Sequence, residues 1–263
     1  MDNVCNLMFE FSSVDRVSIL LLLKKTPLKL SHISEKLDFT VQETARNLSR
    51  LNDAKLISKD VDGLFHLTPY GEETLSLLSG FRFLLKNKEY FQTHSPATLP
   101  KRFELSVGIF EDAEFVNDVM IVFHNVENMI AESQESVCIV TNQILASTLP
   151  HLVQAMERGV TFRLLMPKDY LPTKEIRKLV NTPTFEKAAK TGKMDLHFIE
   201  KIDSFLCFSE MQIAALGFVN LEGKLDYAGF RTQDPIALEW ANALFSHYWN
   251  RSSEKIPDQL FTT

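Results

Sequence analysis

The stretch "TVQETARNLSRLNDAKLISKDVDGLFHLTPYGEE", residues 40–73, has the pattern of one helix followed by a two-stranded hairpin. Thr40 is a good N-cap, because its hydroxyl can accept a hydrogen bond from an early backbone N–H. Two short alternating runs follow, at residues 56–59 and 64–67, and the Asp62-Gly63 pair between them is a strong hairpin signal. The apolar residues that recur at helical spacing, and that we expect to be buried, are Val41, Ala45, Leu48 and Leu51.

The opposite face of this helix is polar. Arginine, asparagine and glutamine are side chains that can hydrogen-bond base edges bidentately in the major groove of DNA. Glu43 is open to two interpretations, since it could accept a hydrogen bond from cytosine or only orient one of the arginines. The alternative for the whole face is simple solvation, which every amphipathic helix shows on one side; we favour base recognition. The residues expected to point outward are Gln42, Glu43, Arg46, Asn47 and Arg50, and together with Thr40 they are the expected DNA contacts of this helix.

Two further helices are expected before this one. Residues 14–25, "VDRVSILLLLKK", end before Pro27, and residues 30–38, "LSHISEKLD", have Ser31 as a plausible N-cap. Three helices followed by a hairpin are the order of a winged helix-turn-helix, which we place in residues 1–80. The inward positions are Val14, Val17, Leu20 and Leu21 in the first helix, and Leu30, Ile33 and Leu37 in the second.

A long helix is expected after the hairpin. Thr68 and Pro69 supply an N-cap and a first-turn proline, and the helical pattern continues through "EETLSLLSGFRFLLKNKEYF", residues 72–91. Its apolar face is larger than one small winged helix can cover, so we expect it to pair with a second copy in a homodimer. That face carries Leu75, Leu78, Phe81 and Leu85.

The charge of the chain is acidic overall but basic where the winged helix is expected. The formal net charge is -6, whereas residues 16–59 hold nine basic side chains against four acidic ones, a local net charge of +5. Affinity for phosphates depends on the local face, so double-stranded DNA is an admissible partner. Lys29, Lys36 and Lys59 are the expected phosphate contacts.

The bulk properties exclude several other classes of protein. A chain of 263 residues with 45% hydrophobic and 24% charged residues has room for about two domains, each with its own core. The aliphatic run "ILLLL", residues 19–23, is far too short to span a bilayer, and "MDNVC" lacks the basic start of a signal peptide. We therefore expect a cytoplasmic protein without membrane contact. Cys5, Cys138 and Cys207 are isolated, which indicates inert or buried thiols.

The second half of the chain predicts an α/β domain. After a connector at residues 81–110, which includes the "THSPATLPK" loop of residues 93–101, helices and apolar strands alternate. "SVCIVT", "PHLVQAMERG" and "VTFRLLMP" form a β-α-β unit, which places two strands in parallel. Four further segments, "MDLHFIE", "SFLCFSE", "IAALGFVN" and "LDYAGFRT", read as strands of a mixed sheet, and Asp234-Pro235 begins a last helix. The fold class is α+β, with the second domain at residues 111–255 and a tail at 256–263.

Four stretches carry a resemblance to a known family. They are "TNQILASTLPHLVQAMERGVTFRLLMP", residues 141–167, then "GKMDLHFIEKI", "GKLDYAGFRTQDP" and "LFSHYWNR". They resemble the effector domain of archaeal winged-helix transcription regulators found mainly in methanogens, the family named for a regulator of filament formation and methanogenesis. The resemblance implies a phospholipase D-like sheet without the catalytic motif, behind a winged helix related to arsenic-repressor and multidrug-resistance regulators.

An enzyme is the alternative class for the second domain. A phosphodiesterase of this kind needs a His-x-Lys pair, and none of the seven histidines is followed by lysine two positions later. The H-E-x-x-H metal helix, the G-x-S-x-G elbow and the glycine-rich phosphate loops are also missing from the sequence. We expect no catalysis, no cofactor and no metal, although carboxylates brought together from distant positions escape this test.

The remaining roles for the second domain are dimerisation and the sensing of a small effector. In open α/β sheets ligands bind beyond the carboxyl ends of the strands, so polar residues after two neighbouring strands are candidates. An aromatic wall and a guanidinium from the last strand would complete the site. The alternative is that the amides cap a turn and that the arginine forms a structural ion pair. The candidates are Thr141, Asn142, Gln143, Met166, Lys168, Tyr227, Arg231 and Gln233.

Overall fold

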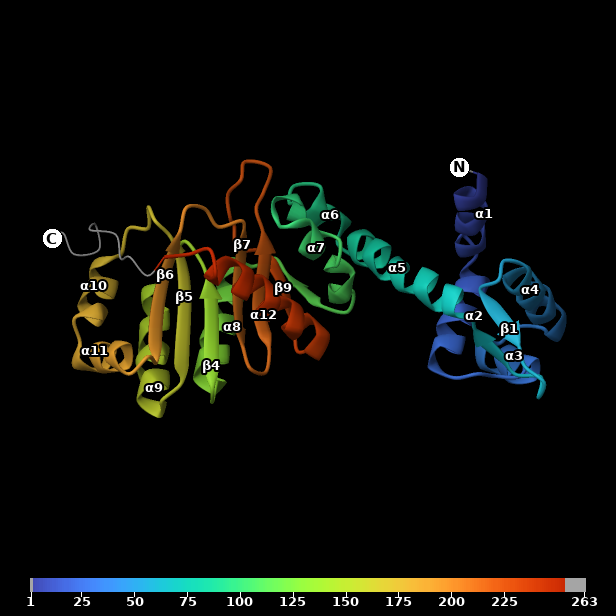
Figure 1. Ribbon diagram of the computed structural model, residues 1–263, viewed down its shortest axis with the longest axis horizontal. Coiled ribbons are helices and arrows are strands. Elements are labelled where there is room, and N and C mark those ends of the chain that lie inside the picture. The colour runs from blue at the N-terminus through green and yellow to red at the C-terminus, as the bar shows by residue number, and fades with distance from the viewer. Residues whose placement is uncertain (1, 254–263) are drawn as a thin grey trace. The chain divides into compact units, whose positions relative to one another are not determined.

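The computed structural model describes residues 2–253 and divides into two compact units, with the division between Phe81 and Arg82. Figure 1 shows a helical unit with a small hairpin and a larger unit built on one sheet. The predicted α+β class, a winged helix followed by a mixed-sheet domain, is confirmed. The predicted tail at 256–263 lies outside the described residues.

The first unit is a winged helix preceded by one additional helix. Its elements are α1 (Asp2–Phe11), α2 (Val14–Lys25), α3 (Leu30–Leu37), α4 (Val41–Asp53), β1 (Ile57–Lys59), β2 (Phe65–Leu67) and the first part of α5 (Pro69–Lys86). The strands of the wing are antiparallel, with Ile57 opposite Leu67. Leu28 joins the wing through an isolated antiparallel bridge to Phe65, with N–H···O distances of 2.8 and 3.1 Å.

Local chemistry sets the ends of these elements. Thr40 and Glu43 form a capping box at the start of α4, in which each side chain accepts from the other's backbone N–H. Asp60 closes the wing by accepting from the backbone N–H groups of residues 62 and 64. Gly63 has a φ of +82°, a conformation that costs glycine little. The Asp-Gly signal in the sequence therefore marks the observed turn.

The buried face of α2 differs from the prediction. Val14 was expected inward but is 80% exposed, while Leu20 is fully buried as expected. The face is rotated because Arg16 turns inward, where its guanidinium donates to the backbone oxygens of Phe9 and Glu10 at the end of α1. The residues of α2 that are buried are Arg16, Ile19, Leu20 and Leu23.

The second unit is built on a mixed sheet with the order β3-β9-β8-β7-β4-β5-β6 among the residues that the structure describes. β4, β5 and β6 are parallel neighbours, and every other pairing is antiparallel. The predicted β-α-β unit is present as β4, α9 and β5, and Gly159 ends α9 with a φ of +88°. The strands are β3 (Glu114–Val116), β4 (Ser136–Val140), β5 (Thr161–Pro167), β6 (Met194–Ile199), β7 (Ser204–Ser209), β8 (Ile213–Phe218) and β9 (Gly229–Thr232).

Helices cover both faces of this sheet. One face packs against α8, α9 and α11, and the other packs against α12. Asp234 caps α12 by accepting from the backbone N–H groups of residues 236 and 237, as the Asp-Pro pair predicts. The helices are α8 (Val119–Glu132), α9 (Leu149–Arg158), α10 (Lys174–Val180), α11 (Pro183–Lys190) and α12 (Pro235–Trp249).

The segment expected as a connector belongs to the core of the second unit. Residues 88–110 form short turns of helix, including α6 (Lys88–Phe91) and α7 (Lys101–Glu104), instead of continuing α5. Tyr90, Phe103 and Phe110 are each at most 4% exposed and pack on the α12 face of the sheet. Three buried aromatic side chains hold this stretch on the sheet, so it does not act as a free linker.

In the part of the chain that the structure covers, no helix combines the length and the apolar character needed to cross a membrane.

Candidate functional site

The exposed face of α4 is the first candidate, and it differs in part from the predicted face. Val41 is 62% exposed and Ala45 is also exposed, although both were expected to be buried. Thr44 takes an inward position instead, because its hydroxyl donates to the Thr40 carbonyl at 3.0 Å and so is satisfied without water. The residues of α4 that are buried are Thr44, Asn47, Leu48 and Leu51.

Asn47 does not belong to the outer face. Its side chain is 3% exposed, and its Nδ2 has no hydrogen-bond partner within residues 2–253. An amide in this position cannot reach a base edge without leaving the core of the unit. The prediction that Asn47 points outward is therefore wrong, because the buried stripe of α4 lies further round the helix than its apolar residues indicate.

Gln42 and Arg46 lie on the exposed face, where the sequence places them. Neither side chain makes a hydrogen bond or an ion pair within the described residues, so both are available to a ligand. Ser49, which the prediction did not include, is exposed one turn further along the same face. This face offers an amide, a guanidinium and a hydroxyl, all groups that hydrogen-bond base edges or phosphates.

Thr40 and Glu43 serve the helix itself. The Glu43 carboxylate accepts from the Thr40 backbone N–H at 3.1 Å and from its hydroxyl at 2.7 Å. The hydroxyl hydrogen bond is the main cause that lowers the pKa of Glu43, and the Arg46 charge adds a smaller effect. Of the two interpretations left open for Glu43, neither describes its observed contacts, which cap the N-terminus of α4.

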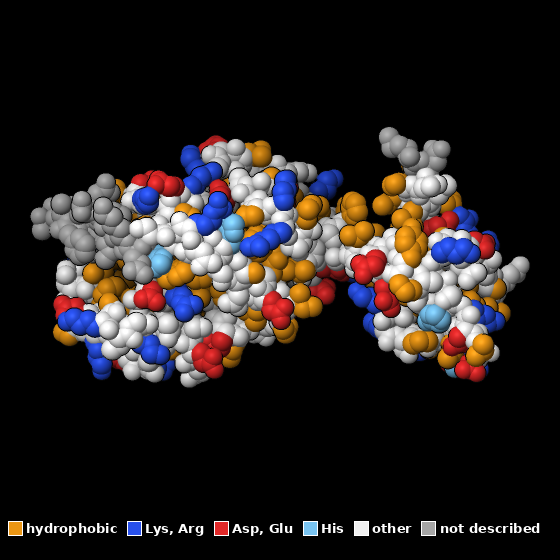
Figure 2. Space-filling model, in the orientation of Figure 1, with side chains coloured by type: hydrophobic (Ala, Val, Ile, Leu, Met, Phe, Trp, Pro, Cys, Tyr) orange, Lys and Arg blue, Asp and Glu red, His pale blue; other side chains and the backbone are white. Residues whose placement is uncertain are grey.

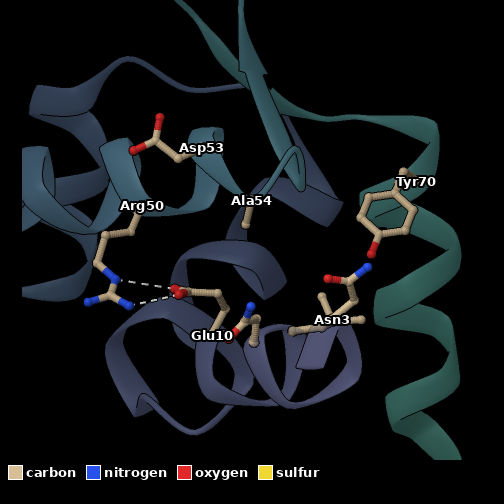
Figure 3. Close-up of a pocket in the computed structure, with 8 residues that line it drawn as sticks. Asn3, Glu10, Arg50, Asp53, Ala54 and Tyr70 are labelled. Carbon is tan, nitrogen blue, oxygen red and sulfur yellow. Dashed lines mark hydrogen bonds and ion pairs between the residues drawn. The ribbon is translucent and has the colours of Figure 1, made fainter. Parts of the chain in front are cut away.

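Arg50 is bound within the unit. Its Nη2 lies 2.7 Å from Oε1 of Glu10, its Nε lies 3.3 Å from Oε2, and its guanidinium stacks over the Phe9 ring at 5.0 Å. Figure 3 shows Arg50 and Glu10 facing each other from α4 and α1. The hydrogen bond to Glu10 raises the pKa of Arg50. Arg50 was expected to read bases, but the structure gives it a different partner, in a helix that the prediction omitted.

The same Glu10 carboxylate also binds Arg16. Arg16 Nε lies 2.8 Å from Glu10 Oε2, and the two side chains are only 9% and 13% exposed. One carboxylate thus joins α1 to both α2 and α4. We name Glu10, Arg16, Arg50 and the Phe9 ring, over which both guanidiniums lie, the α1 clamp.

An open cleft of about 600 Å³ lies beside the α1 clamp, between α1, α4 and the start of α5. Most of the residues that line it have polar side chains, and in Figure 3 the side chains of Asn3 and Tyr70 point toward each other. Close by, α1 exposes Val4, Met8 and Phe9, and Figure 2 shows hydrophobic side chains at this surface of the first unit. The cleft is lined by Asn3, Asn6, Leu7, Glu10, Arg50, Asp53, Ala54 and Tyr70.

The three lysines expected at phosphates are all exposed. Lys29 precedes α3 and Lys36 lies in its last turn, and neither has an ion-pair partner among the described residues. Lys59 ends β1 in the wing, with its Nζ 5.5 Å from the centre of the Phe65 ring. That contact is a weak cation–π interaction at an exposed site and leaves the ammonium open to solvent.

In the second unit, the residues that follow β4 lie beside the residues that precede β9, at the end of the sheet where β4 finishes. The Tyr227 hydroxyl donates to Oδ1 of Asn142 and lies 3.4 Å from Oε1 of Gln143. The Thr141 hydroxyl donates to the Gln143 carbonyl at 2.8 Å and thereby caps the turn. Burial raises the pKa of Tyr227 to about 12, so its hydroxyl stays a donor at neutral pH. Four of the predicted effector residues are therefore neighbours.

The other predicted effector residues are engaged elsewhere. Met166 is 2% exposed in a cluster with Tyr170 and Phe198, and the Lys168 ammonium pairs with the Glu200 carboxylate. Arg231 lies 2.7 Å from Glu114 across β3 and β9 and also donates to Asn125 of α8, which is the structural ion pair weighed as the alternative. Gln233 is exposed beyond the far end of β9.

His94 and Asp226 form a pair of an imidazole and a carboxylate, which are groups that enzymes also combine. His94 Nε2 lies 2.8 Å from Asp226 Oδ2, and Nδ1 lies 2.9 Å from the Thr93 hydroxyl and 3.1 Å from the Tyr90 carbonyl. The imidazole is 8% exposed and is stacked on Tyr90 at 4.0 Å. A hydroxyl nucleophile needs free space around it, whereas Thr93 also lies 3.3 Å from the Tyr90 carbonyl. The pair ties this loop to the sheet.

Two features near the site were not predicted. The helix α1 has only a weak signal in the sequence, in which Leu7 and Phe11 have helical spacing and Ser13 follows as the N-cap of α2. Tyr170 gave no signal at all, because a tyrosine in a loop after a strand carries no pattern.

One family model matches part of the second unit, and several solved structures are similar to larger parts of the chain. Residues 121–251 match the family model described as methanogenesis regulatory protein FilR1, middle domain. No curated protein matches the chain. Among solved structures, the archaeal chromatin protein TrmBL2 is similar at 12% identity and a TM-score of 0.42, over 96% of this chain and 100% of that one.

Two other solved structures are more distant. Nuc, a phospholipase D family member from Salmonella typhimurium, has 13% identity and a TM-score of 0.37, over 49% of this chain and 86% of that one. IdeR of T. acidophilum has 15% identity and a TM-score of 0.23, over 84% and 97%. The family model is thus the most informative of these findings: residues 121–251, within the second unit, match the middle domain of the methanogenesis regulatory protein FilR1.

Proposed function

We propose that this protein is a sequence-specific DNA-binding transcription regulator. The observation that carries the proposal is the exposed face of α4, where Gln42 and Arg46 have no partner within the described residues. In a winged helix this position enters the major groove, and an arginine there binds guanine bidentately. The family of the second unit, described as a methanogenesis regulatory protein, agrees with this role.

The basic residues around α4 support the same role. Lys29 and Lys36 flank α3, and Lys59 lies in the wing, so their ammonium groups can contact phosphates on both sides of an inserted helix. These contacts supply affinity without sequence information, and their strength falls as salt rises. The acidic surplus in the rest of the chain lowers nonspecific association, which favours a regulator over a general DNA coat. Such a regulator acts in the cytoplasm, at the chromosome.

The protein acts as a homodimer in this proposal. Helix α5 exposes a stripe of apolar side chains at positions i, i+4, i+7 and i+8. This stripe differs from the predicted apolar face of the helix, because Leu75 is buried in the core of the first unit and Leu78 packs against that core. An apolar stripe of this kind on a single helix suits pairing with the same stripe of a second copy about a two-fold axis. The operator would then be an inverted repeat. The stripe consists of Leu77, Phe81, Leu84 and Leu85, which are 72%, 54%, 41% and 72% exposed.

The second unit serves effector sensing and dimerisation rather than catalysis. The polar corner of Thr141, Asn142, Gln143 and Tyr227 lies where ligands bind in open α/β sheets. Tyr227 also holds a φ of +68°, which is unfavourable for a bulky residue and is often found at functional positions. An effector would change the affinity of the protein for DNA only to the extent that the effector binds one of two protein conformations more tightly than the other.

The experiment that tests the proposal is a binding selection with sheared DNA from the source organism, followed by sequencing. We expect one enriched motif with two-fold symmetry. A protein-interaction adaptor is the competing function, and uniform recovery of all fragments together with protein partners that survive Arg46→Ala would favour it. Retention of the motif by the variant Arg50→Ala would show that Arg50 does not read bases.

A further inference from the structure

Arg50 lies at one end of the side of α4 that faces DNA in our proposal. Gln42, Arg46 and Arg50 recur every four residues, so they lie along the same side of the helix. Gln42 and Arg46 are in the first two turns, whereas Arg50 is in the last turn. In DNA-binding helices of this kind the N-terminal residues contact base edges, and the C-terminal end lies closer to the phosphate backbone. The position of Arg50 is therefore that of a phosphate contact.

The charge of Arg50 is already compensated within the first unit. The side chain is 42% exposed and lines the open cleft beside α1, so solvent reaches its guanidinium. Both oxygens of the Glu10 carboxylate accept from it, at 2.7 Å from Nη2 and 3.3 Å from Nε (Figure 3). The pair as a whole carries no net charge, and a neutral pair attracts a phosphate much less than a free guanidinium does.

A second ion pair fixes the carboxylate of Glu10 in this position. Its Oε2 lies 2.8 Å from Nε of Arg16, and these two side chains are only 13% and 9% exposed. The Arg16 guanidinium is itself held by the backbone oxygens of Phe9 and Glu10, at 2.7 and 3.0 Å. An exposed ion pair between two mobile side chains contributes little, but a carboxylate fixed by a shielded partner stays beside Arg50.

This carboxylate stands against an otherwise basic surface. Residues 16–59 carry a local net charge of +5, and Glu10 precedes them in the chain. Lys29, Lys36 and Lys59 supply phosphate contacts in our proposal, and a free Arg50 would add one more. Each such contact strengthens binding to every DNA sequence and makes the affinity depend more steeply on salt.

We propose that Glu10 limits sequence-independent affinity for DNA, because it neutralises Arg50 at the end of α4 that lies closest to the phosphates. The inference rests on the proposed binding of DNA by α4, and it assigns a residue that restrains this binding. Arg16 is a positioning residue, since it holds the carboxylate against Arg50 and is itself shielded from solvent. Arg46 remains the arginine that reads bases.

The test compares the affinity of the full chain for the selected operator and for a scrambled duplex, at about 50 to 200 mM salt. In Glu10→Gln the uncompensated Arg50 should strengthen binding to both duplexes alike, roughly two- to tenfold at the lowest salt. The slope of log affinity against log salt should become steeper by about 0.9. Arg50→Ala in the same background should remove this gain. Arg50→Lys should keep most of it, because a phosphate contact needs the charge and not the planar fork of arginine.

Two further variants separate this effect from net charge and from folding. Glu35→Gln in α3 changes the net charge of the first unit by the same amount, and its effect on affinity should not depend on Arg50. Glu10→Gln leaves the shielded Arg16 guanidinium without its carboxylate, so the double variant Glu10→Gln/Arg16→Met is measured as well and should show the same gain. Circular dichroism verifies that each variant is folded.

Three results would each overturn the inference: no gain on either duplex in a folded variant without the Glu10 charge, a gain that survives Arg50→Ala, or a gain confined to the operator. The proposed function fails in a different way. A wild type that binds both duplexes equally contradicts base recognition but leaves the comparison of Glu10 variants intact, whereas a wild type that binds neither duplex contradicts both proposals.

Discussion

Oε1 of Glu10 lies 2.7 Å from Nη2 of Arg50, so the first helix holds an arginine of the helix that faces DNA in our proposal. Oε2 of the same carboxylate lies 2.8 Å from Nε of Arg16, and this second pair is mostly shielded from water. A partly buried carboxylate with two guanidinium partners is a strong tether between helices. It leaves Arg46 as the arginine of α4 with no partner among the described residues.

Removal of the Glu10 charge should destabilise the first unit. In Glu10→Gln the nearly buried guanidinium of Arg16 loses its carboxylate, and we expect a loss of about 1–3 kcal/mol in the free energy of unfolding. Urea titration followed by circular dichroism measures it. The control is Glu35→Gln in α3, an exposed carboxylate without an ion pair among the described residues, which should change stability by less than about 0.5 kcal/mol. Equal effects of the two changes would mean that the α1 clamp contributes nothing.

Two glycines of α5 should respond to alanine in opposite directions. A Cβ on Gly71 would lie 1.9 Å from the backbone oxygen of Leu56, so Gly71→Ala must push α5 away from the wing and should cost about 1–3 kcal/mol. Apart from the neighbouring residues and backbone of α5 itself, no atom of the described residues lies within 4 Å of such a Cβ at Gly80, so Gly80→Ala should stabilise the helix by up to about 1 kcal/mol. Thermal unfolding of both variants gives the sign of each change in stability. A Gly71→Ala variant as stable as the wild type would contradict the close approach of Gly71 to the backbone of Leu56.

Disruption of the α5 stripe should produce monomers. Leu77→Lys places a charge within the stripe and should shift the protein from dimer to monomer at micromolar concentration, as seen by sedimentation equilibrium. Ser76→Lys adds the same charge at the adjacent exposed position and should leave the dimer intact. If the wild type is already a monomer, or if both variants behave alike, α5 is not the dimer interface.

Stability should depend on pH through Glu210. Burial alone would raise the pKa of this carboxyl, but backbone N–H donors of residues 134 and 136, at 2.8 and 3.1 Å, outweigh burial and lower it. A lowered pKa in the folded state gives stability that is complete above the unfolded value of about 4.3 and is lost as the pH falls below it. Wild type should therefore exceed Glu210→Gln by a few tenths to about 1 kcal/mol at pH 7, and this advantage should vanish near pH 3.

The control for this pH dependence is Glu157→Gln, at an exposed residue of α9 that has no hydrogen-bond partner among the described residues. It should follow the wild type at every pH. An advantage of wild type over Glu210→Gln that persists unchanged at pH 3 would show that the side chain acts by shape and not by charge.

The elements that the sequence predicted well are those with strong local signals. Asp234-Pro235 marks the start of α12, Gly159 the end of α9, and the apolar runs of β4 and β5 a parallel pair. Capping residues and continuous apolar runs indicate these elements directly in the sequence, and the tertiary structure agrees with these local signals.

The face of α4 was only partly predictable. Apolar spacing selected Val41 and Ala45 for burial, but tertiary packing buried Thr44, whose hydroxyl is satisfied by the backbone, and Asn47. Likewise, sequence spacing could not reveal that Glu10, forty residues away, binds Arg50. Polar residues with an internal partner cannot be distinguished from free ones by periodicity.

The residues predicted to form one effector site do not all lie together, because the direction of β9 separates some of them. β9 spans Gly229–Thr232, so Tyr227 precedes the strand and Gln233 follows it, and the two lie at opposite ends. β9 joins the sheet through three successive antiparallel pairings from β4, which brings its start to the edge where β4 ends. The direction of a strand in a mixed sheet is not encoded in its apolar pattern.

The most direct test of the central claim is the affinity of the Arg46→Ala protein for the selected operator and for a scrambled duplex of equal length. Loss of a bidentate contact with guanine should weaken operator binding by about 1–3 kcal/mol, roughly five- to 150-fold, while binding to the scrambled duplex changes little. The control Lys178→Ala removes an exposed charge from α10 and should leave both affinities unchanged. Equal weakening on both duplexes, or none on the operator, would contradict base recognition by α4.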